Sequence, residues 1–326
     1  MTSLQLLKFL DDPNWDAAFF KRLAANDTGN APGHQGGVVI PMELRPFFPE
    51  LDEDLTSSLA PTTDRYLTAE MYLVGDFVAS DVVRYQIQTW GGTRSAESRI
   101  TGQLGPIRNL AHGGDLFIIQ RSRDSLESFR LILVRQTDPA FIGINEVTGG
   151  RRWGGLDATR RPITQQEIAE ARVTMISESG GTFIPIQPQI RRETTTRTAI
   201  ARDTAFRDTL LRQYQRRCAV SGIGLATQSI TEAQAAHVIP LGRGGPDEPR
   251  NGLLLTGTLH WAFDRGLFGV DADRRIIVPH SVQIMTTNEW LRQYDGKSIC
   301  EAIVEALRTA DEAFEWHRKN LVSQWL

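Results

Sequence analysis

Between about Gly37 and Ile144, hydrophobic residues occur in short runs that are rich in β-branched and aromatic side chains. The runs GVVIP, RYLTAEMYLV, DLFIIQ and FRLILVRQ are separated by Gly, Pro, Asp and Ser. Runs of this length with such punctuation predict the strands of a β-rich barrel or sandwich. We also expect a helix near Asn14–Ala25 to precede the first strand.

The pattern changes after a Gly- and Arg-rich break at Gly149–Gly155. Ile163–Ser179 is typical of a connecting helix, and the following GGTFIPIQPQI, with two prolines, indicates a linker. The chain therefore divides into a β-rich domain at 1–155, a linker with a helix at 156–196 and a third part at 197–326. This organisation predicts an α+β fold.

An arginine-rich helix is predicted to open the third part. Arg191 to Arg217 contains eight arginines, and its hydrophobic residues fall on one helical stripe: Phe206, Leu210, Leu211 and Tyr214. We expect this stripe to pack in the core. For the arginines, a solvated helix face and a phosphate-binding face both remain open.

Composition narrows the class of protein without deciding its function. The 326 residues include 40% hydrophobic and 23% charged residues, with a net charge of -3. No apolar run is long enough to cross a bilayer, and the N-terminal MTSLQLLKFLDDPNW lacks the features of a secretory signal. Two cysteines are too few for a disulfide framework. We therefore expect a cytoplasmic protein without a membrane partner.

The most informative stretch for chemistry begins at His237, which we place on a strand. A Gly/Pro loop follows, then a second strand from Asn251, then a short helix that carries His260 and Asp264. Residues four apart share one face of a helix, so this imidazole and carboxylate can bind one divalent cation, which could be Mg²⁺, Mn²⁺, Ni²⁺ or Zn²⁺. An unligated histidine nearby can accept a proton from water.

Each of these residues also has an ordinary structural explanation. A histidine in a strand is usually a packing residue, a His/Asp pair on a helix is often a salt bridge, and Asn-Gly is often a turn. It is their order and spacing together that favour a site.

The segment from about Ala205 to Val278 resembles the HNH endonucleases, whose fold is a ββα-metal finger. The motif AAHVIPL…NGLLLTGTLHWAFDRGLF carries the resemblance. It implies that His237 is the general base, that Asn251 braces the loop and orients that histidine, and that His260 and Asp264 bind one metal ion.

The segment departs from the family at two positions. Ala236 stands where many members have a metal-binding residue directly before the general base. Cys218 is the one remaining cysteine of the paired motifs that bind a structural zinc in many members. We therefore expect no structural zinc, and we expect Cys218 to behave as a small buried hydrophobe.

Two polar loops are the notable feature of the N-terminal part. One follows Lys21 and passes through His34, and the other combines Arg94 and Arg99 with Glu97. Arginine and glutamate are side chains that read base edges in the major groove. A surface turn with an internal Arg–Glu pair is the alternative explanation of the second loop.

The motifs KRLAANDTGNAPGHQGGVVIP and TRSAESRIT resemble two recognition arms of the N-terminal effector-binding domain of the restriction enzyme EcoRII, a DNA-binding pseudobarrel. The resemblance covers about residues 15–155. It implies that five residues contact DNA: Lys21, His34, Arg94, Glu97 and Arg99. The second arm is one residue longer here, and Val39 replaces an expected aromatic residue. The resemblance therefore implies the type of domain and not the DNA sequence that it recognises.

Together, the two resemblances predict a restriction-type endonuclease that hydrolyses a phosphodiester bond of duplex DNA with one metal ion per site. It would be either an ordinary enzyme with a partner methyltransferase or one that cuts DNA with 5-methyl- or 5-hydroxymethylcytosine. Because one finger cuts one strand, we expect a homodimer or a DNA-bridged pair. A DNA-binding regulator with a degenerate nuclease domain is the alternative. An RNA-directed or nonspecific nuclease is disfavoured by the two arms.

Overall fold

The structure is a computed structural model that describes residues 1–28, 36–52, 56–57, 59–89, 95–157, 161–186, 196–227 and 229–326. The chain forms two compact units, Met1–Gln166 and Glu167–Leu326, except that Ser229 and Ile230 belong to the first. The division falls inside the segment expected to be a linker. Among the described residues, no helix combines the length and hydrophobicity that a membrane-spanning segment needs.

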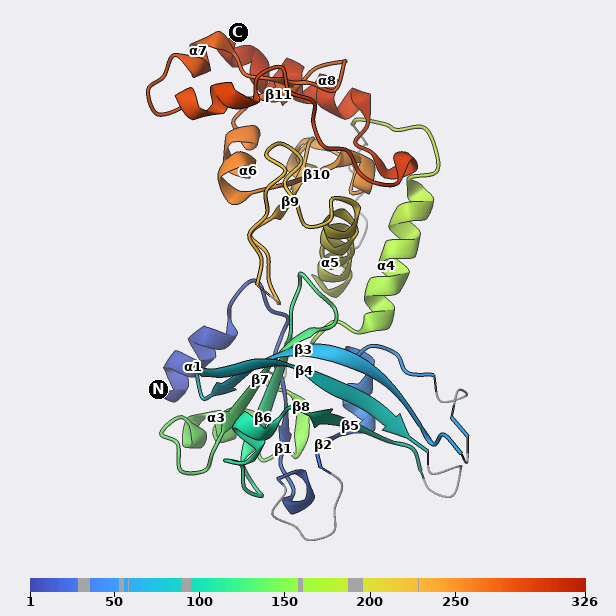
Figure 1. The fold of residues 1–326 in the computed structure, drawn as a ribbon, viewed down its shortest axis with the longest axis vertical. Helices are drawn as coiled ribbons and strands as arrows, with labels where there is room; N and C mark the ends of the chain where they lie inside the picture. The colour runs from blue at the N-terminus through green and yellow to red at the C-terminus, as the bar shows by residue number, and fades with distance from the viewer. Residues whose placement is uncertain are drawn as a thin grey trace. The chain divides into compact units, whose positions relative to one another are not determined.

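The first unit is built on an eight-stranded sheet (Figure 1) with the strand order β2-β5-β4-β3-β7-β6-β1-β8. All neighbouring strands are antiparallel except β3 and β7. The strands are β1 (Phe19–Arg22), β2 (Val38–Ile40), β3 (Thr62–Leu73), β4 (Asp76–Gln88), β5 (Glu97–Gly102), β6 (Leu116–Arg121), β7 (Ser128–Val134) and β8 (Trp153–Gly155). Its helices are α1 (Ser3–Leu10), α2 (Gly105–Arg108) and α3 (Phe141–Thr148).

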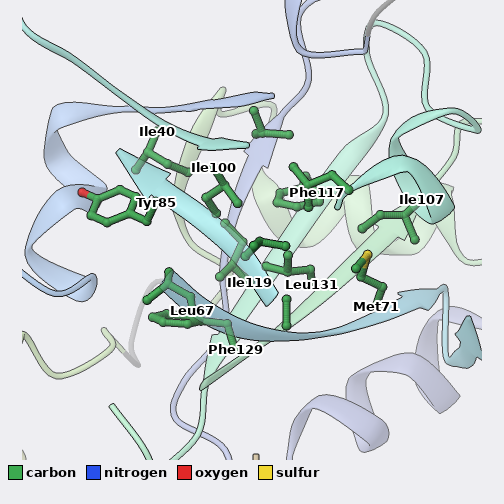
Figure 2. Packing of buried hydrophobic residues seen from close by; sticks show 14 of the residues in the cluster. Ile40, Leu67, Met71, Tyr85, Ile100, Ile107, Phe117, Ile119, Phe129 and Leu131 are labelled. Atoms are coloured by element: carbon green, nitrogen blue, oxygen red, sulfur yellow. The ribbon is translucent and has the colours of Figure 1, made fainter. Parts of the chain in front are cut away.

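The sheet is buried on both faces where β1, β6 and β7 run. One core cluster contains Ile40 and Ile100 from one end of the sheet together with Phe117 and Ile119 from the other. Figure 2 shows these side chains converging, so the sheet curls around them. A second cluster packs the opposite face against α1 and α3. The predicted α+β fold, with a β-rich barrel-like first domain, is confirmed.

The prediction of a helix near Asn14–Ala25 is wrong. The opening helix is α1, which begins after the capping residue Thr2, and the later segment forms strand β1. The reason is the alternation of Phe19 and Phe20, which are both fully buried but belong to opposite core clusters. Adjacent residues point to opposite faces of a strand, so a strand buries both rings where a helix would bury one.

The second unit contains helices α4 (Gln165–Glu178, which starts at the unit boundary), α5 (Thr196–Gln213), α6 (Gly257–Asp264), α7 (His280–Gln283) and α8 (Asp311–Asn320). Its strands form two antiparallel pairs, β9 (Gln234–His237) with β10 (Gly252–Leu255), and β11 (Gly269–Val270) with β12 (Ile276–Ile277). Helices α5 and α6 both pack on the β9–β10 hairpin (Figure 1). The predicted stripe on α5 is buried, as expected.

Helix α8 supports α6 through His317. Its ring stacks on Phe263 with centroids 3.8 Å apart, and its Nε2 donates a hydrogen bond to the Phe263 carbonyl oxygen at 2.9 Å. Its Nδ1 is buried without a hydrogen-bonding partner. A proton added there would therefore be a buried charge without an acceptor, and burial lowers the pKa of His317 to about 4.

We expect acid to destabilise the protein through His317. The folded chain binds this proton less readily than the unfolded chain, so the stability is fully present above about pH 6.5 and is lost as the pH falls towards about 4. The pKa shift corresponds to about 3 kcal/mol. Urea unfolding of wild type and His317→Phe at a series of pH values measures it. An identical pH dependence in both proteins would contradict the assignment.

Candidate functional site

Strand β9, strand β10 and helix α6 bring the predicted residues of the second unit together. His237 ends β9 and pairs with Gly252 of β10, while α6 carries His260 and Asp264 at a spacing of one turn. The predicted succession of strand, loop, strand and helix is therefore present. His237 and His260 are close enough to influence each other electrostatically.

Asn251 braces the loop between β9 and β10. Its side chain is fully buried, and its Oδ1 accepts a hydrogen bond from the Ile239 amide at 2.8 Å. Its Nδ2 donates to the carbonyl oxygens of Ile239 and Pro246 at 2.9 and 2.8 Å. Three backbone groups that would otherwise be unsatisfied are thus paired, which fixes the loop at both ends.

Gly252 is required by the close approach of α5. A Cβ at this position would lie 2.8 Å from the ring of Phe206 and 2.7 Å from a methyl carbon of Leu210. Phe206 in turn stacks on His237, with ring centroids 4.1 Å apart and an angle of 4° between the planes. The Asn-Gly pair is therefore not merely a turn, because it lets α5 reach the histidine.

His260 and Asp264 form the pair that can bind a cation. His260 Nε2 and Asp264 Oδ2 are 3.6 Å apart, and the other ring nitrogen, Nδ1, is 2.8 Å from Gln234 Oε1. An amide oxygen only accepts, so Nδ1 carries the proton and Nε2 presents a lone pair. Burial lowers the pKa of His260; Asp264 partly offsets this, whereas His237 and Arg207 lower it further. A neutral imidazole beside a carboxylate fits a divalent metal ion.

No group of three or more His, Cys, Asp or Glu side chains capable of holding a metal ion occurs among the described residues. The side chain of Ala236 is fully buried, so this position adds no ligand. A metal held by His260 and Asp264 would thus complete its coordination with water or a substrate oxygen. Cys218 is also fully buried, as expected of a small hydrophobe.

Sequence patterns did not reveal two further polar residues of the site. Asp247 lies in the loop, and its Oδ1 is 3.1 Å from His237 Nε2. Gln234 holds His260 as described above. Asp247 is ten residues from its partner and Gln234 is twenty-six residues from its partner. No helical or strand periodicity predicts such contacts; only the folded hairpin creates them.

Three of the predicted DNA-binding residues lie in the described part of the first unit: Lys21, Glu97 and Arg99. Lys21 is buried, and its Nζ donates to Asp27 Oδ1 at 2.8 Å and to the Val39 carbonyl oxygen at 2.6 Å. Burial lowers the pKa of Lys21, and Asp27 partly offsets the effect. Val39 is the register partner of Arg99, which forms an ion pair with Glu97.

The structure therefore gives Lys21 an internal position, whereas a DNA contact was expected. The Lys21 ammonium links strand β1, which precedes the first arm, to strand β2, which follows it. Glu97 and Arg99, at the base of the second arm, lie close enough to influence the pKa of Lys21. The internal Arg–Glu pair considered as the alternative is also present. His34 and Arg94 lie outside the described residues.

The β9–β10 hairpin followed by α6, with its histidine and aspartate, has the order of elements expected of a ββα finger. Residues 218–271 match the family model described as HNH endonuclease, so the second unit contains an HNH endonuclease domain. A comparison with curated proteins gives no match.

Two solved structures of restriction endonucleases are similar to the chain. The B3 domain of the UbaLAI restriction endonuclease with cognate DNA has 21% identity and a TM-score of 0.28, over 40% of this chain and 78% of that one. The modification-dependent TagI restriction endonuclease has 13% identity and a TM-score of 0.31, over 95% of this chain and 78% of that one.

We expect Gln234→Leu to weaken metal binding by roughly 10- to 100-fold, because the variant no longer fixes the proton on Nδ1 of His260. Calorimetric titration with Mn²⁺ or Ni²⁺ measures the affinity. Gln293→Leu, an exposed position outside the site, is the matched control. Equal affinities in the two variants would show that Gln234 does not prepare His260 for the metal.

Proposed function

We propose that this chain is a restriction-type DNA endonuclease whose first unit binds a specific duplex site and whose HNH domain hydrolyses a phosphodiester bond. The observation that carries the proposal is that His237 lies close enough to the His260–Asp264 pair to act on it electrostatically, within a segment that matches the HNH endonucleases.

His237 would be the general base. Its Nε2 forms a hydrogen bond with Asp247, and Phe206 stacks on one face of the ring. The side chain is still 19% exposed. The remaining nitrogen, Nδ1, can therefore take a proton from a water molecule as that water attacks phosphorus. Such proton transfer contributes about 10²- to 10⁴-fold to a rate.

His260 and Asp264 would hold a divalent cation, which when bound offsets the negative charge that develops on the phosphate and the leaving oxygen. Arg207 is the nearby cation that this chain itself supplies, since it lies close enough to affect the pKa of His260. We infer that Arg207 contacts a phosphate oxygen. This would assign one arginine of α5 to phosphate binding. Arg207 Nη2 also donates to the Ala233 carbonyl oxygen at 3.4 Å, which places its guanidinium beside strand β9.

The first unit would read duplex DNA through the two arms. The pairing of β2 with β5 and the buried Lys21–Asp27 pair support this, because they fix the bases of both arms on one rigid sheet. We include His34, Arg94, Glu97 and Arg99 as DNA contacts, and we assign Lys21 to holding the arms in place. Rigid support of this kind keeps base-reading side chains in register with the groove.

One HNH finger cuts one strand, so a double-strand break needs two active sites. We infer that two copies act together, either as a homodimer or as a pair bridged by DNA. A methyltransferase partner belongs to the variant in which cytosine modification protects the site. A DNA-binding regulator without cleavage is the competing function, and it is worth testing directly because the described residues supply only two protein ligands to the candidate metal site.

We expect His237→Ala to lose at least about 100-fold in the rate of plasmid nicking with Mg²⁺ or Mn²⁺, because the base that activates water is removed. DNA affinity, measured by gel shift in Ca²⁺, should stay within a few-fold of wild type. Wild type with EDTA is the second control. Wild type that binds a DNA site tightly but never nicks would favour the regulator.

We expect cleavage to depend on cytosine modification. A changed contact to one base typically costs about 1–3 kcal/mol, so rates on matched unmodified, 5-methyl and 5-hydroxymethyl duplexes should differ by at least about fivefold. Digestion of phage DNA of each type measures this. Faster cutting of modified DNA identifies the modification-dependent variant, and faster cutting of unmodified DNA identifies the methyltransferase-protected one. Equal rates would contradict the prediction.

A further inference from the structure

We propose that Asp247 is a positioning residue that keeps the proton of His237 on Nε2, and that Arg202 holds Asp247 in place for this task. The inference rests on the proposed role of His237 as the base. It adds two residues, from the loop and from α5, to the machinery of the HNH domain.

The geometry at His237 leaves one arrangement of the proton on the neutral ring. Asp247 Oδ1 is 3.1 Å from Nε2, and an ionised carboxylate can only accept a hydrogen bond. A neutral imidazole that donates from Nε2 must carry its lone pair on Nδ1. Within the described part of the chain, Nδ1 has no hydrogen-bonding partner. Phe206 covers one face of the ring, so the imidazole cannot turn freely away from this bond.

Arg202 fixes the carboxylate from the opposite side. Its Nε donates to Asp247 Oδ2 at 3.1 Å, and its Nη2 donates to the Asp247 carbonyl oxygen, also at 3.1 Å. The same Nη2 is 3.0 Å from Glu178 Oε2 on α4. The guanidinium is therefore held by two helices and grips both the side chain and the backbone of Asp247.

Asp247 remains charged in this setting. Burial opposes its ionisation, but the hydrogen bonds from His237 and Arg202, together with the positive charge beside the carboxylate, outweigh burial and lower the pKa of the Asp247 carboxyl. When Nδ1 takes a proton from water, the ring becomes an imidazolium, and the carboxylate at Nε2 stabilises that positive charge. The proton taken from water stays on Nδ1, and Asp247 accepts none.

An ordinary ion pair is the alternative explanation of these contacts. Asp247 and Arg202 keep side-chain exposures of 26% and 14%, and partly exposed pairs contribute little to stability. A purely structural pair would thus leave both the cleavage rate and the protonation of His237 unchanged when it is removed. These two quantities separate the explanations.

The kinetic experiment compares Asp247→Ala, Asp247→Asn and Arg202→Gln with wild type in plasmid nicking with Mn²⁺. We expect Asp247→Ala to reduce kcat by about 100-fold or more with KM changed by less than about threefold, since the histidine loses its preferred tautomer. The kcat of Asp247→Asn should lie between those of wild type and Asp247→Ala, because its amide oxygen can still accept a hydrogen bond from Nε2 without supplying a charge. Arg202→Gln should lower kcat less than Asp247→Ala.

Arg212→Gln is the matched control. Arg212 lies on the same helix and also pairs with a carboxylate, Asp208, but it is 63% exposed and does not contact the loop. We expect it to cut at the wild-type rate. Thermal unfolding of every variant shows whether a loss of activity follows from a loss of folding.

A second measurement does not depend on cleavage. Nitrogen-15 NMR of histidine-labelled protein near pH 8 reports which ring nitrogen carries the proton, and His237→Gln identifies the signals of His237. Wild type should show a protonated Nε2 and an unprotonated Nδ1, and Asp247→Ala should show a mixture of tautomers. An unchanged tautomer in a folded Asp247→Ala protein would overturn the inference.

The two proposals can fail separately. If His237→Ala is inactive but Asp247→Ala has the wild-type kcat, the inference is wrong and the nuclease assignment stands. If wild type never cuts, the nuclease assignment is wrong, and the NMR spectra still decide whether Asp247 sets the proton on His237.

Discussion

The buried amide of Asn251 ties both ends of the loop between β9 and β10, and the geometry of the second unit depends on it. Its three hydrogen bonds satisfy backbone groups of Ile239 and Pro246 that have no strand partner. Each such group left unpaired would cost about 1–3 kcal/mol. The loop therefore has one well-defined path, and that path places Asp247 against His237. Without it, the histidine would lack its orienting partner.

The first unit solves a similar problem with charge. The carboxylate of Asp27 accepts from the amides of Ala24 and Val39 as well as from Lys21, and it is fully buried. A buried carboxylate is tolerated only when its oxygens are paired in this way. The pairing joins the segment before the first arm to the strand after it. In both units, then, one buried polar side chain joins backbone segments that are separate in sequence.

The sequence allowed the hairpin, α6 and the α5 core stripe to be predicted, because local spacing determines them. His260 and Asp264 share a helical face because they are four residues apart. Phe206 belongs to a hydrophobic stripe with clear helical spacing. The segment around Phe19 and Phe20 was mispredicted because two adjacent aromatic residues fit either a helix or a doubly buried strand. The contacts of Gln234 and Asp247 could not be predicted, since they join residues far apart in sequence. Burial of Lys21 was missed because no strand or helix periodicity predicts its two partners, Asp27 six residues away and the Val39 carbonyl eighteen residues away.

The structure explains why Ala236, rather than the metal-binding residue that many HNH endonucleases have, precedes His237. Ala236 and His237 are neighbours on β9, so they point to opposite sides of the hairpin, and the methyl group of Ala236 is enclosed in the core. A carboxylate there would be buried without a partner, so the core packing itself favours alanine. The hairpin instead contributes to the candidate metal site through Gln234 on β9, which orients His260 by accepting a hydrogen bond from its Nδ1. In this domain the strand thus contributes orientation of a ligand, whereas helix α6 contributes the ligands.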